Sequence, residues 1–471
     1  MRFTRIISLL LSLAIGAMTL ASCSPADSTP ALTEEEKLTL LKEAYIYTLP
    51  LMLMDATFTK MTNTVHATNL QAPPNRFIHA RSLADADFKN VVTPNVDTIY
   101  SQVFYDLSQE PLILEFPKTD RFCTVEVMDA YTNCIALMDA TTFTSESEVY
   151  TFIREGSSNT APVGTKTISS PTNRGWVIVR TICNSREDEV NVHEIQSDMR
   201  SYTLSGYRDG KTNEDSVGRF DAQNNFIPVD HVMSMGMEAY FTRANQLMQD
   251  NPPSEADGTF VKKIAGIGVG AGLTFDPSIF GDNAGALWKE MVSGITTSVT
   301  EASMKFMTKN GVWSYMGAPI AEFGTEYDYR ALIALVGLGA NPVSVAVYPK
   351  ATTDCAGARL NGQDSYTLHF EKDGLPPVRP HGFWSVTAYD SGTNLLIDNA
   401  IDRYCINDRT DLTFNADGSL DIRIQAQDPG DETVNWLPVS DGDFHFVLRI
   451  YFPDERVLTG EWKAPTITKN T

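Results

Sequence analysis

The stretch that decides the fold is TIYSQVF, residues 98–104, where β-branched and aromatic residues follow one another without helical spacing. A run of the same kind, GWVIVR at residues 175–180, begins in the turn cluster Asn173-Arg174-Gly175. Between residues 91 and 190 such runs alternate with turns, and no helical pattern that could serve as a parallel crossover lies between them. This part of the chain is therefore expected to form an antiparallel β-sandwich.

Helical patterns lie on both sides of this β-rich part. TEEE at residues 33–36 matches a capping box, and apolar residues follow at helical spacing up to Pro50. Between residues 232 and 338 two more stretches have apolar residues at helical spacing, namely Met233, Met237, Phe241, Ala244 and Met248, and then Trp288, Met291, Ile295 and Val299. We interpret the methionines as core filling, and a hydrophobic ligand groove is the less favoured alternative.

A second β-rich part begins at residue 343. Its apolar runs are VSVAVY (343–348), FWSVTAY (383–389) and FHFVLRIY (444–451). NADG at residues 415–418 lies between two of these runs and is typical of a hairpin turn. We therefore expect a second β-sandwich at the end of the chain.

The N-terminus has the layout of an export signal. Arg2 and Arg5 precede an apolar run over residues 6–20, which is shorter than the about 20 apolar residues that a lasting transmembrane helix needs. The run leads into LASC, residues 20–23, which resembles the lipobox of bacterial lipoproteins. We predict cleavage before Cys23 and attachment of lipid to its thiol, with a simple secretory signal and a chance cysteine as the alternative.

The charge of the chain restricts its partners. There are 37 lysines and arginines against 59 acidic residues, and cleavage would remove two of these arginines, Arg2 and Arg5. An acidic body favours neither nucleic acid nor anionic head groups, so attachment to a membrane would rest on the Cys23 lipid alone. Because Ser24 follows Cys23, the expected location is extracytoplasmic, on the outer membrane of a diderm bacterium or the cell membrane of a monoderm one. A small-molecule ligand and a homo-oligomer are both compatible with this location.

No cofactor and no metal are predicted. The GxSxG, HExxH and GxxxxGK[ST] motifs are missing from the sequence. GIGVGAG at 266–272 is interpreted as a helix end, and DGDFH at 441–445 and NADGSLD at 415–421 as turns with too few spaced ligands. Five cysteines remain besides Cys23, an odd number without a CxxC pair, and their disulfide pairing stays open: Cys123, Cys134, Cys183, Cys355 and Cys405.

Several segments, in order along the chain, resemble a known pair of bacterial domains. NVVTPNVDTIY (90–100) and VMDAYTN (127–133) look like the domain of unknown function numbered 1254. Six later segments are similar to its usual partner, numbered 1214: GFWSVTAYD (382–390), RY (403–404), NDRT (407–410), DGSL (417–420), NWLP (435–438) and LRIY (448–451). This resemblance implies a helical portion, an immunoglobulin-like sandwich and a jelly-roll-like sandwich, and it brings no established activity.

The expected fold is therefore mixed and mainly β, and five ranges divide the chain. They are a signal peptide at 1–22, a lipidated tether at 23–32, a helix plus the immunoglobulin-like sandwich at 33–230, a helical region at 231–340 and the jelly-roll-like sandwich at 341–471.

Polar residues inside otherwise apolar strands are the candidate catalytic groups. Asp97 and Tyr100 lie in one such segment, and Asp129 and Tyr131 in another. A carboxyl group buried among aromatic rings has a raised pKa, which suits general acid/base catalysis. The residues predicted to bind a substrate are Asn95, Arg330, His381 and Arg403, with Arg409 beside Asp408 as a further cation.

Two hypotheses of function remain open. In the first, a cell-envelope enzyme uses acid/base chemistry of the hydrolase or lyase type on a small polar or glycan-like molecule. In the second, a lipid-anchored module binds a ligand or an assembly partner without catalysis, Asp97 and Asp129 cap turns, and the arginines form ion pairs between domains. The enzyme hypothesis requires Asp97, Tyr100, Asp129 and Tyr131 to converge on one pocket with an arginine nearby.

Overall fold

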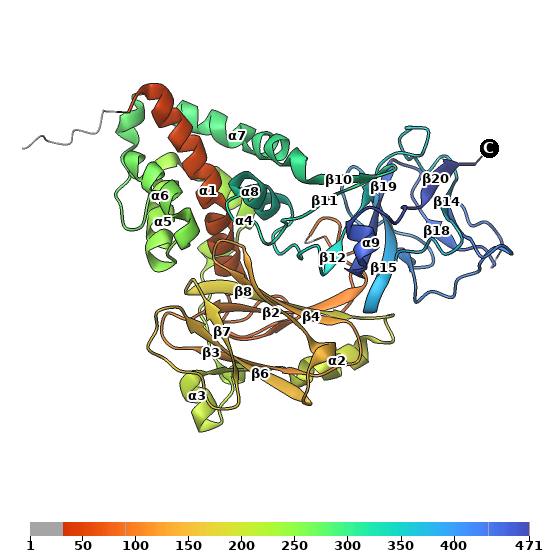
Figure 1. Ribbon diagram of the computed structural model, residues 1–471, viewed down its shortest axis with the longest axis horizontal. Coiled ribbons are helices and arrows are strands. Elements are labelled where there is room, and N and C mark those ends of the chain that lie inside the picture. The colour runs from red at the N-terminus through yellow and green to blue at the C-terminus, as the bar shows by residue number, and fades with distance from the viewer. Residues whose placement is uncertain (1–31, 90, 432, 471) are drawn as a thin grey trace, which may run out of the picture.

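The computed structural model describes residues 32–89, 91–431 and 433–470. The predicted signal peptide, Cys23 and the tether up to residue 31 lie outside these described residues. Figure 1 shows a helical part, a first β-sandwich below it and a second β-sandwich to its right. The expected mixed fold, with helices at the start and in the middle of the chain and most strands in two sandwiches, is confirmed.

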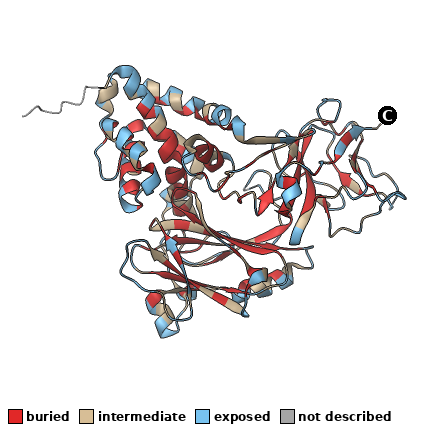
Figure 2. Ribbon diagram, viewed as in Figure 1, coloured by how far each residue is buried: buried red, intermediate tan, exposed pale blue. Residues whose placement is uncertain are grey.

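Helix α1 (Glu34–Met61) begins at the predicted capping box. The Thr33 hydroxyl accepts a hydrogen bond from the Glu36 backbone N–H, and the Glu36 carboxylate accepts one from the Thr33 N–H. The helix continues through Pro50, beyond the stretch that the apolar spacing indicated, although an internal proline costs about 3 kcal/mol. Residues 46–54 are all buried, so packing on every side of the helix outweighs this cost (Figure 2).

Further helices pack around α1. They are α4 (Pro228–Ser234), α5 (Met237–Asp250), α6 (Gly258–Ile264), α7 (Ala284–Ser303) and α8 (Tyr327–Val336). Met237 and Met248 of α5 are buried in the core shared with α1, which confirms the core-filling interpretation. After α6 the chain passes through a short 3-10 turn to Gly268, whose φ of 78° marks the expected helix end. No helix among the described residues is long and apolar enough to cross a membrane.

Two facing sheets form the first sandwich. Their strand orders are β1–β2–β8–β4–β5 and β7–β6–β3–β9. The strands are β1 (Ile78–His79), β2 (Thr98–Asp106), β3 (Leu112–Pro117), β4 (Cys123–Asp129), β5 (Cys134–Asp139), β6 (Ser147–Arg154), β7 (Lys166–Ser170), β8 (Arg174–Ile182) and β9 (Arg200–Thr203), with helices α2 (Glu189–Asp198) and α3 (Leu204–Asp209). The antiparallel prediction is confirmed for every neighbouring pair except β6 and β7, which are parallel.

The second sandwich also has two sheets. One has the order β10–β11–β13–β19–β15–β16, with β12 also paired to β19, and the other has the order β18–β17–β14–β20. The strands are β10 (Met307–Asn310), β11 (Trp313–Met316), β12 (Ala346–Val347), β13 (Lys350–Ala351), β14 (Tyr366–Phe370), β15 (Val378–Asp390), β16 (Cys405–Asn407), β17 (Leu420–Gln425), β18 (Trp436–Pro438), β19 (Phe444–Pro453) and β20 (Thr466–Lys469), with helix α9 (Glu455–Leu458).

Two expectations about this second sandwich are wrong. Strands β10 and β11 lie inside the range 231–340 that we expected to be helical, and they extend the sheet of the second sandwich because Trp313 fills its core. The NADG turn forms, with the Gly418 N–H donating to the Asn415 carbonyl at 2.9 Å, but it makes no hairpin. The flanking strands β16 and β17 pair in different sheets, since the apolar residues of each face the core from opposite sides.

The pairing of the five described cysteines is also settled by the fold. Cys123, Cys134, Cys183, Cys355 and Cys405 are all free thiols. Burial raises the pKa of the Cys123 thiol to about 11, so this group is inert, whereas Cys355 is exposed.

Candidate functional site

The four candidate catalytic residues do not converge. Tyr100 on β2 pairs with Arg180 of β8, whereas Asp129 on β4 pairs with Gly175 at the other end of the same strand. Five residues of extended chain correspond to about 17 Å. Asp97 precedes β2 at the Tyr100 end, and Tyr131 follows Asp129 in the β4–β5 turn. The predicted residues therefore fall into two separate clusters.

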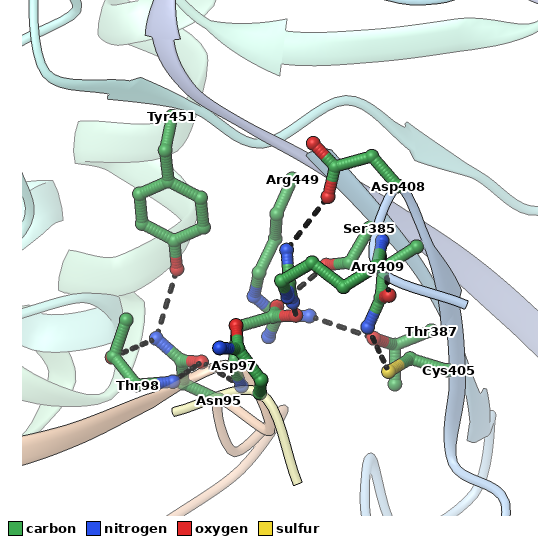
Figure 3. Close-up of polar contacts among 12 residues, drawn as sticks. Asn95, Asp97, Thr98, Ser385, Thr387, Cys405, Asp408, Arg409, Arg449 and Tyr451 are labelled. Atoms are coloured by element: carbon green, nitrogen blue, oxygen red, sulfur yellow. Dashed lines mark hydrogen bonds and ion pairs between the residues drawn. The ribbon is translucent and has the colours of Figure 1, made fainter. Parts of the chain in front are cut away.

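The first group, which we call the junction cluster, joins the two sandwiches and consists of Asn95, Asp97, Ser385, Arg409 and Tyr451 (Figure 3). The Asp97 carboxylate is fully buried. Its Oδ1 accepts a hydrogen bond from Arg409 Nη2 at 2.7 Å, and its Oδ2 accepts one from the Ser385 hydroxyl at 2.5 Å. Both carboxylate oxygens are thus occupied by protein groups from the second sandwich.

Asn95 holds the start of β2 against the second sandwich. Its Oδ1 accepts hydrogen bonds from the backbone N–H groups of Asp97 and Thr98, and its Nδ2 lies 2.8 Å from the hydroxyl of Tyr451 and 3.0 Å from that of Tyr100. Arg449 adds a contact from β19 to the Thr93 carbonyl at 2.9 Å. These contacts agree with the alternative in which the polar residues form turns and ion pairs between domains.

The second group, which we call the tyrosine cage, surrounds Arg330. The guanidinium carbon lies 5.3 Å from the ring centroid of Tyr47, 5.7 Å from that of Tyr131 and 5.2 Å from that of Tyr327. Tyr47 comes from α1, Tyr131 from the β4–β5 turn, and Tyr327 lies one turn before Arg330 on α8, so that both face the same side of that helix. Asp257, just before α6, completes the cage.

Within the cage the tyrosine hydroxyls are occupied by protein acceptors. The two oxygens of Asp257 accept hydrogen bonds from Tyr327 at 2.7 Å and from Tyr47 at 3.1 Å. Tyr131 donates to the carbonyl of Asn251 at 2.9 Å. Burial raises the pKa of each of these three phenols, so they stay protonated and act as hydrogen-bond donors rather than bases.

Arg330 itself is not satisfied. Its side chain is 1% exposed, and its Nε and Nη2 atoms are buried without a hydrogen-bond partner among the described residues. A buried guanidinium with two unpaired donor nitrogens costs free energy unless an acceptor meets it. The cage therefore has the chemistry of a binding site for a molecule that carries acceptor oxygens.

Asp129 lies next to the cage, but its carboxylate accepts hydrogen bonds within the β4–β5 turn. Its Oδ1 accepts from the N–H groups of Tyr131 and Asn133, and its Oδ2 accepts from the Asn133 side chain, each at 2.9 Å. Burial raises the pKa of the Asp129 carboxyl, while these hydrogen bonds and the charge of Arg330 oppose the rise. The structure thus brings Asp129, Tyr131 and Arg330 together, and Asp129 caps the β4–β5 turn.

The other two predicted binding residues lie in neither cluster. His381 is exposed, and its Nδ1 lies 2.9 Å from the Asp120 carbonyl. Arg403 donates to the Trp436 carbonyl at 3.0 Å. Sequence reasoning missed Tyr47 and Asp257 because a tyrosine at helical spacing and an acid before a helix are typical of core and cap positions.

Two protein-family models match the chain, one in each sandwich. Residues 74–203 match the family model described as "Protein of unknown function (DUF1254)", and residues 345–455 match the one described as "Protein of unknown function (DUF1214)". Tyr47, Asp257 and Arg330 lie outside both matched ranges. No curated protein matches the chain.

Two solved structures are similar to the chain. The crystal structure of the VPA0106 protein from Vibrio parahaemolyticus has a TM-score of 0.69 at 22% identity, over 92% of this chain and 100% of that one, which shows a shared fold. A crystal structure of an uncharacterized protein from Burkholderia cenocepacia has a TM-score of 0.42 at 11% identity, over 93% of this chain and 94% of that one.

Proposed function

Since the chain belongs to the proteins that join a DUF1254 domain to a DUF1214 domain, we propose that it is a non-catalytic, lipid-anchored module that binds a small ligand in the tyrosine cage. The single observation that carries this proposal is the buried Arg330 side chain with Nε and Nη2 unpaired. Each unmet buried donor costs about 1–3 kcal/mol, and a ligand oxygen would offset that cost.

The chemistry of the cage supports binding rather than acid/base catalysis. The three phenols have raised pKa values and donate to protein acceptors, so none is poised to remove a proton near neutral pH. The Asp129 carboxylate accepts hydrogen bonds within its own turn, and the Asp97 carboxylate accepts one from Arg409 in the junction cluster. A hydrolase or lyase would need a carboxyl group free to reach its substrate.

The proposed location is extracytoplasmic, with Cys23 as the lipid attachment point. The support is the lipobox-like LASC at residues 20–23 behind an apolar run. The ten residues between Cys23 and the start of α1 at Glu34 could span at most about 35 Å. The tether would therefore hold the helical part, which contains the cage, close to the membrane surface.

A thermal-shift screen of the full-length protein tests the binding function. The panel contains small carboxylates, phosphates, sulfates and neutral amides, and a ligand of the cage raises the melting temperature of the wild type. Arg330→Met is expected to abolish this shift. Arg403→Met is the matched control, because the Arg403 side chain donates to the Trp436 carbonyl and lies outside the cage, and it should keep the shift. Equal shifts in Arg330→Met and wild type would contradict the proposal.

A further inference from the structure

We infer that the ligand of the tyrosine cage is a monocarboxylate with an apolar, flat body, gripped by the Nε–H and Nη2–H edge of Arg330. The inference rests on the proposed binding function and names the class of ligand. It draws on the geometry of the unpaired donors, the charges around them and the aromatic rings of the cage.

The two unpaired nitrogens form a fork. Nε and Nη2 lie on the same edge of a guanidinium group, and their N–H bonds point in parallel toward one side. This edge matches the two oxygens of a carboxylate, which accept both bonds in one plane. A single hydroxyl or carbonyl oxygen would leave one of the two donors unmet.

The rings of the cage limit the approach to this edge. Tyr47, Tyr131 and Tyr327 all lie within 6 Å of the guanidinium carbon and shield its charge from water. With water excluded, a charge-assisted pair with an anion is stronger than it would be at the surface. A ligand that carries a full negative charge should therefore bind more tightly to the cage than a neutral polar ligand.

The charges nearby favour a single negative charge on the ligand. Asp257 is 3% exposed and Asp129 is 5% exposed, so two buried carboxyl groups already lie near one buried guanidinium. The charge of Asp257 acts on the phenols of both Tyr47 and Tyr131, as does that of Arg330. The first negative charge of a ligand would be offset by direct hydrogen bonds to Arg330. A second charge, as on a phosphate monoester, would find no further guanidinium and would meet the repulsion of the two carboxyl groups.

The body of the ligand would lie against aromatic carbon. Phe260 and Tyr327 lie beside the cage, and both side chains are half-buried. Their ring centroids lie 4.5 Å apart. Tyr47 lies 5.1 Å from each of them. Flat apolar groups pack well on such surfaces, whereas a glycan would leave hydroxyl groups without partners.

Isothermal titration of the full-length protein with three matched probes tests the inference. Benzoate, benzamide and phenyl phosphate share one ring and differ in the charge and shape of the polar group. We expect benzoate to bind at least ten-fold more tightly than the other two. Arg330→Lys, which keeps the charge and removes the fork, should weaken benzoate at least ten-fold, while Arg403→Met should leave its affinity unchanged.

The other outcomes separate this inference from the proposed function. If benzamide or phenyl phosphate binds as tightly as benzoate, and Arg330→Met abolishes that binding, the ligand class is wrong while the cage remains a binding site. If none of the three probes binds the wild type, the monocarboxylate inference fails, and the thermal-shift screen decides on the binding function. Benzoate binding that is unchanged in Arg330→Met would overturn both.

Discussion

Arg409 of the second sandwich donates a 2.7 Å hydrogen bond to the fully buried carboxylate of Asp97, which precedes the first long strand of the first sandwich. The pair crosses the junction between the two domains, and Ser385 takes the remaining carboxylate oxygen. Neither sandwich alone can satisfy these charges, so the pair links the stability of each domain to the presence of the other.

Loss of the Asp97 charge should therefore destabilise the whole protein. Asp97→Asn removes the fully buried carboxylate that accepts from both Arg409 and Ser385, so that Arg409 keeps its pair with the partly exposed Asp408. We expect the free energy of unfolding to fall by about 3–5 kcal/mol, as measured by chemical denaturation. Asp408→Asn is the matched control, because Asp408 accepts from the same guanidinium at 2.8 Å but is partly exposed, and its loss should cost under about 1 kcal/mol. A loss in Asp97→Asn as small as that in Asp408→Asn would show that the junction pair does not stabilise the fold.

Substitution of two buried arginines should change stability by very different amounts. Arg180 donates to the fully buried Glu126 at 2.7 Å, so Arg180→Met strands a buried carboxylate and should cost about 3–5 kcal/mol of unfolding free energy. Arg330→Met removes a guanidinium with two unmet donors, and stability should stay within about 1 kcal/mol of the wild type. Both values come from the same denaturation experiment. A large loss in Arg330→Met would mean that the guanidinium stabilises the fold, which a binding residue need not do.

The free energy of unfolding should fall at acid pH because of His445. Burial, helped by the charge of Lys350, lowers the pKa of His445 to about 4 from an ordinary value of 6.5. The unfolded chain then binds the proton more readily than the folded one, so stability is lost as the pH falls from about 6.5 to about 4, by at most roughly 3 kcal/mol. His445→Phe keeps the stacking on Tyr389 and should flatten this part of the stability curve.

His369 provides the opposite sign as a control. Its hydrogen bond to Asp421 raises the pKa of the His369 imidazole, so its contribution is present at low pH and is lost as the pH rises through the folded-state value. His369→Gln should therefore lower stability at acid pH and have little effect at alkaline pH. If both histidine variants change the free energy of unfolding in the same direction at acid pH, the opposite pKa shifts assigned to His445 and His369 are wrong.

The thiols should react with a disulfide reagent in two phases. Cys355 is exposed, while burial raises the pKa of the thiols of Cys134, Cys183 and Cys405 to about 12 and that of Cys123 to about 11. Of these five described thiols, that of Cys355 should be titrated quickly in the native protein, and the other four should follow after denaturation. Cys355→Ser should remove the fast phase alone, and a persistent fast phase in that variant would point to another accessible thiol.

The membrane anchor can be tested separately from the fold. Cys23→Ser removes the proposed acceptor of the lipid, and we expect the protein to move from the membrane fraction to the soluble fraction and to lose incorporation of labelled palmitate. Cys355→Ser should keep both properties. Membrane association that survives Cys23→Ser would contradict lipid anchoring at this residue.

The sequence predicts local signals well and long-range placement poorly. The capping box at Thr33 and Glu36 fixes the start of α1, because its contacts span three residues. The passage of the helix through Pro50 depends on neighbours from the rest of the chain, which no local pattern contains. In the same way, β10 and β11 are strands because a distant sheet pairs with them.

The candidate site shows the same division. The position of polar residues inside apolar strands correctly predicts their burial, since Asp97, Asp129 and Tyr131 are all buried. Their grouping was wrong, because the sequence does not tell which end of β8 each residue reaches. Arg330 was selected as a cation, and its aromatic surroundings became visible only once α1, α8 and the β4–β5 turn were placed together.

The hairpin formed by β10 and β11 has a consequence for dissecting the protein into pieces. Trp313 is buried in the core of the second sandwich, and its indole N–H donates to the Pro465 carbonyl at 2.8 Å. A fragment cut at residue 341, where the helical and β patterns change, would lose this tryptophan and would expose β13 as an open sheet edge, the kind of edge that recruits other chains into aggregates. The unit that stays soluble by itself should begin ahead of β10, inside what the sequence presents as the helical region.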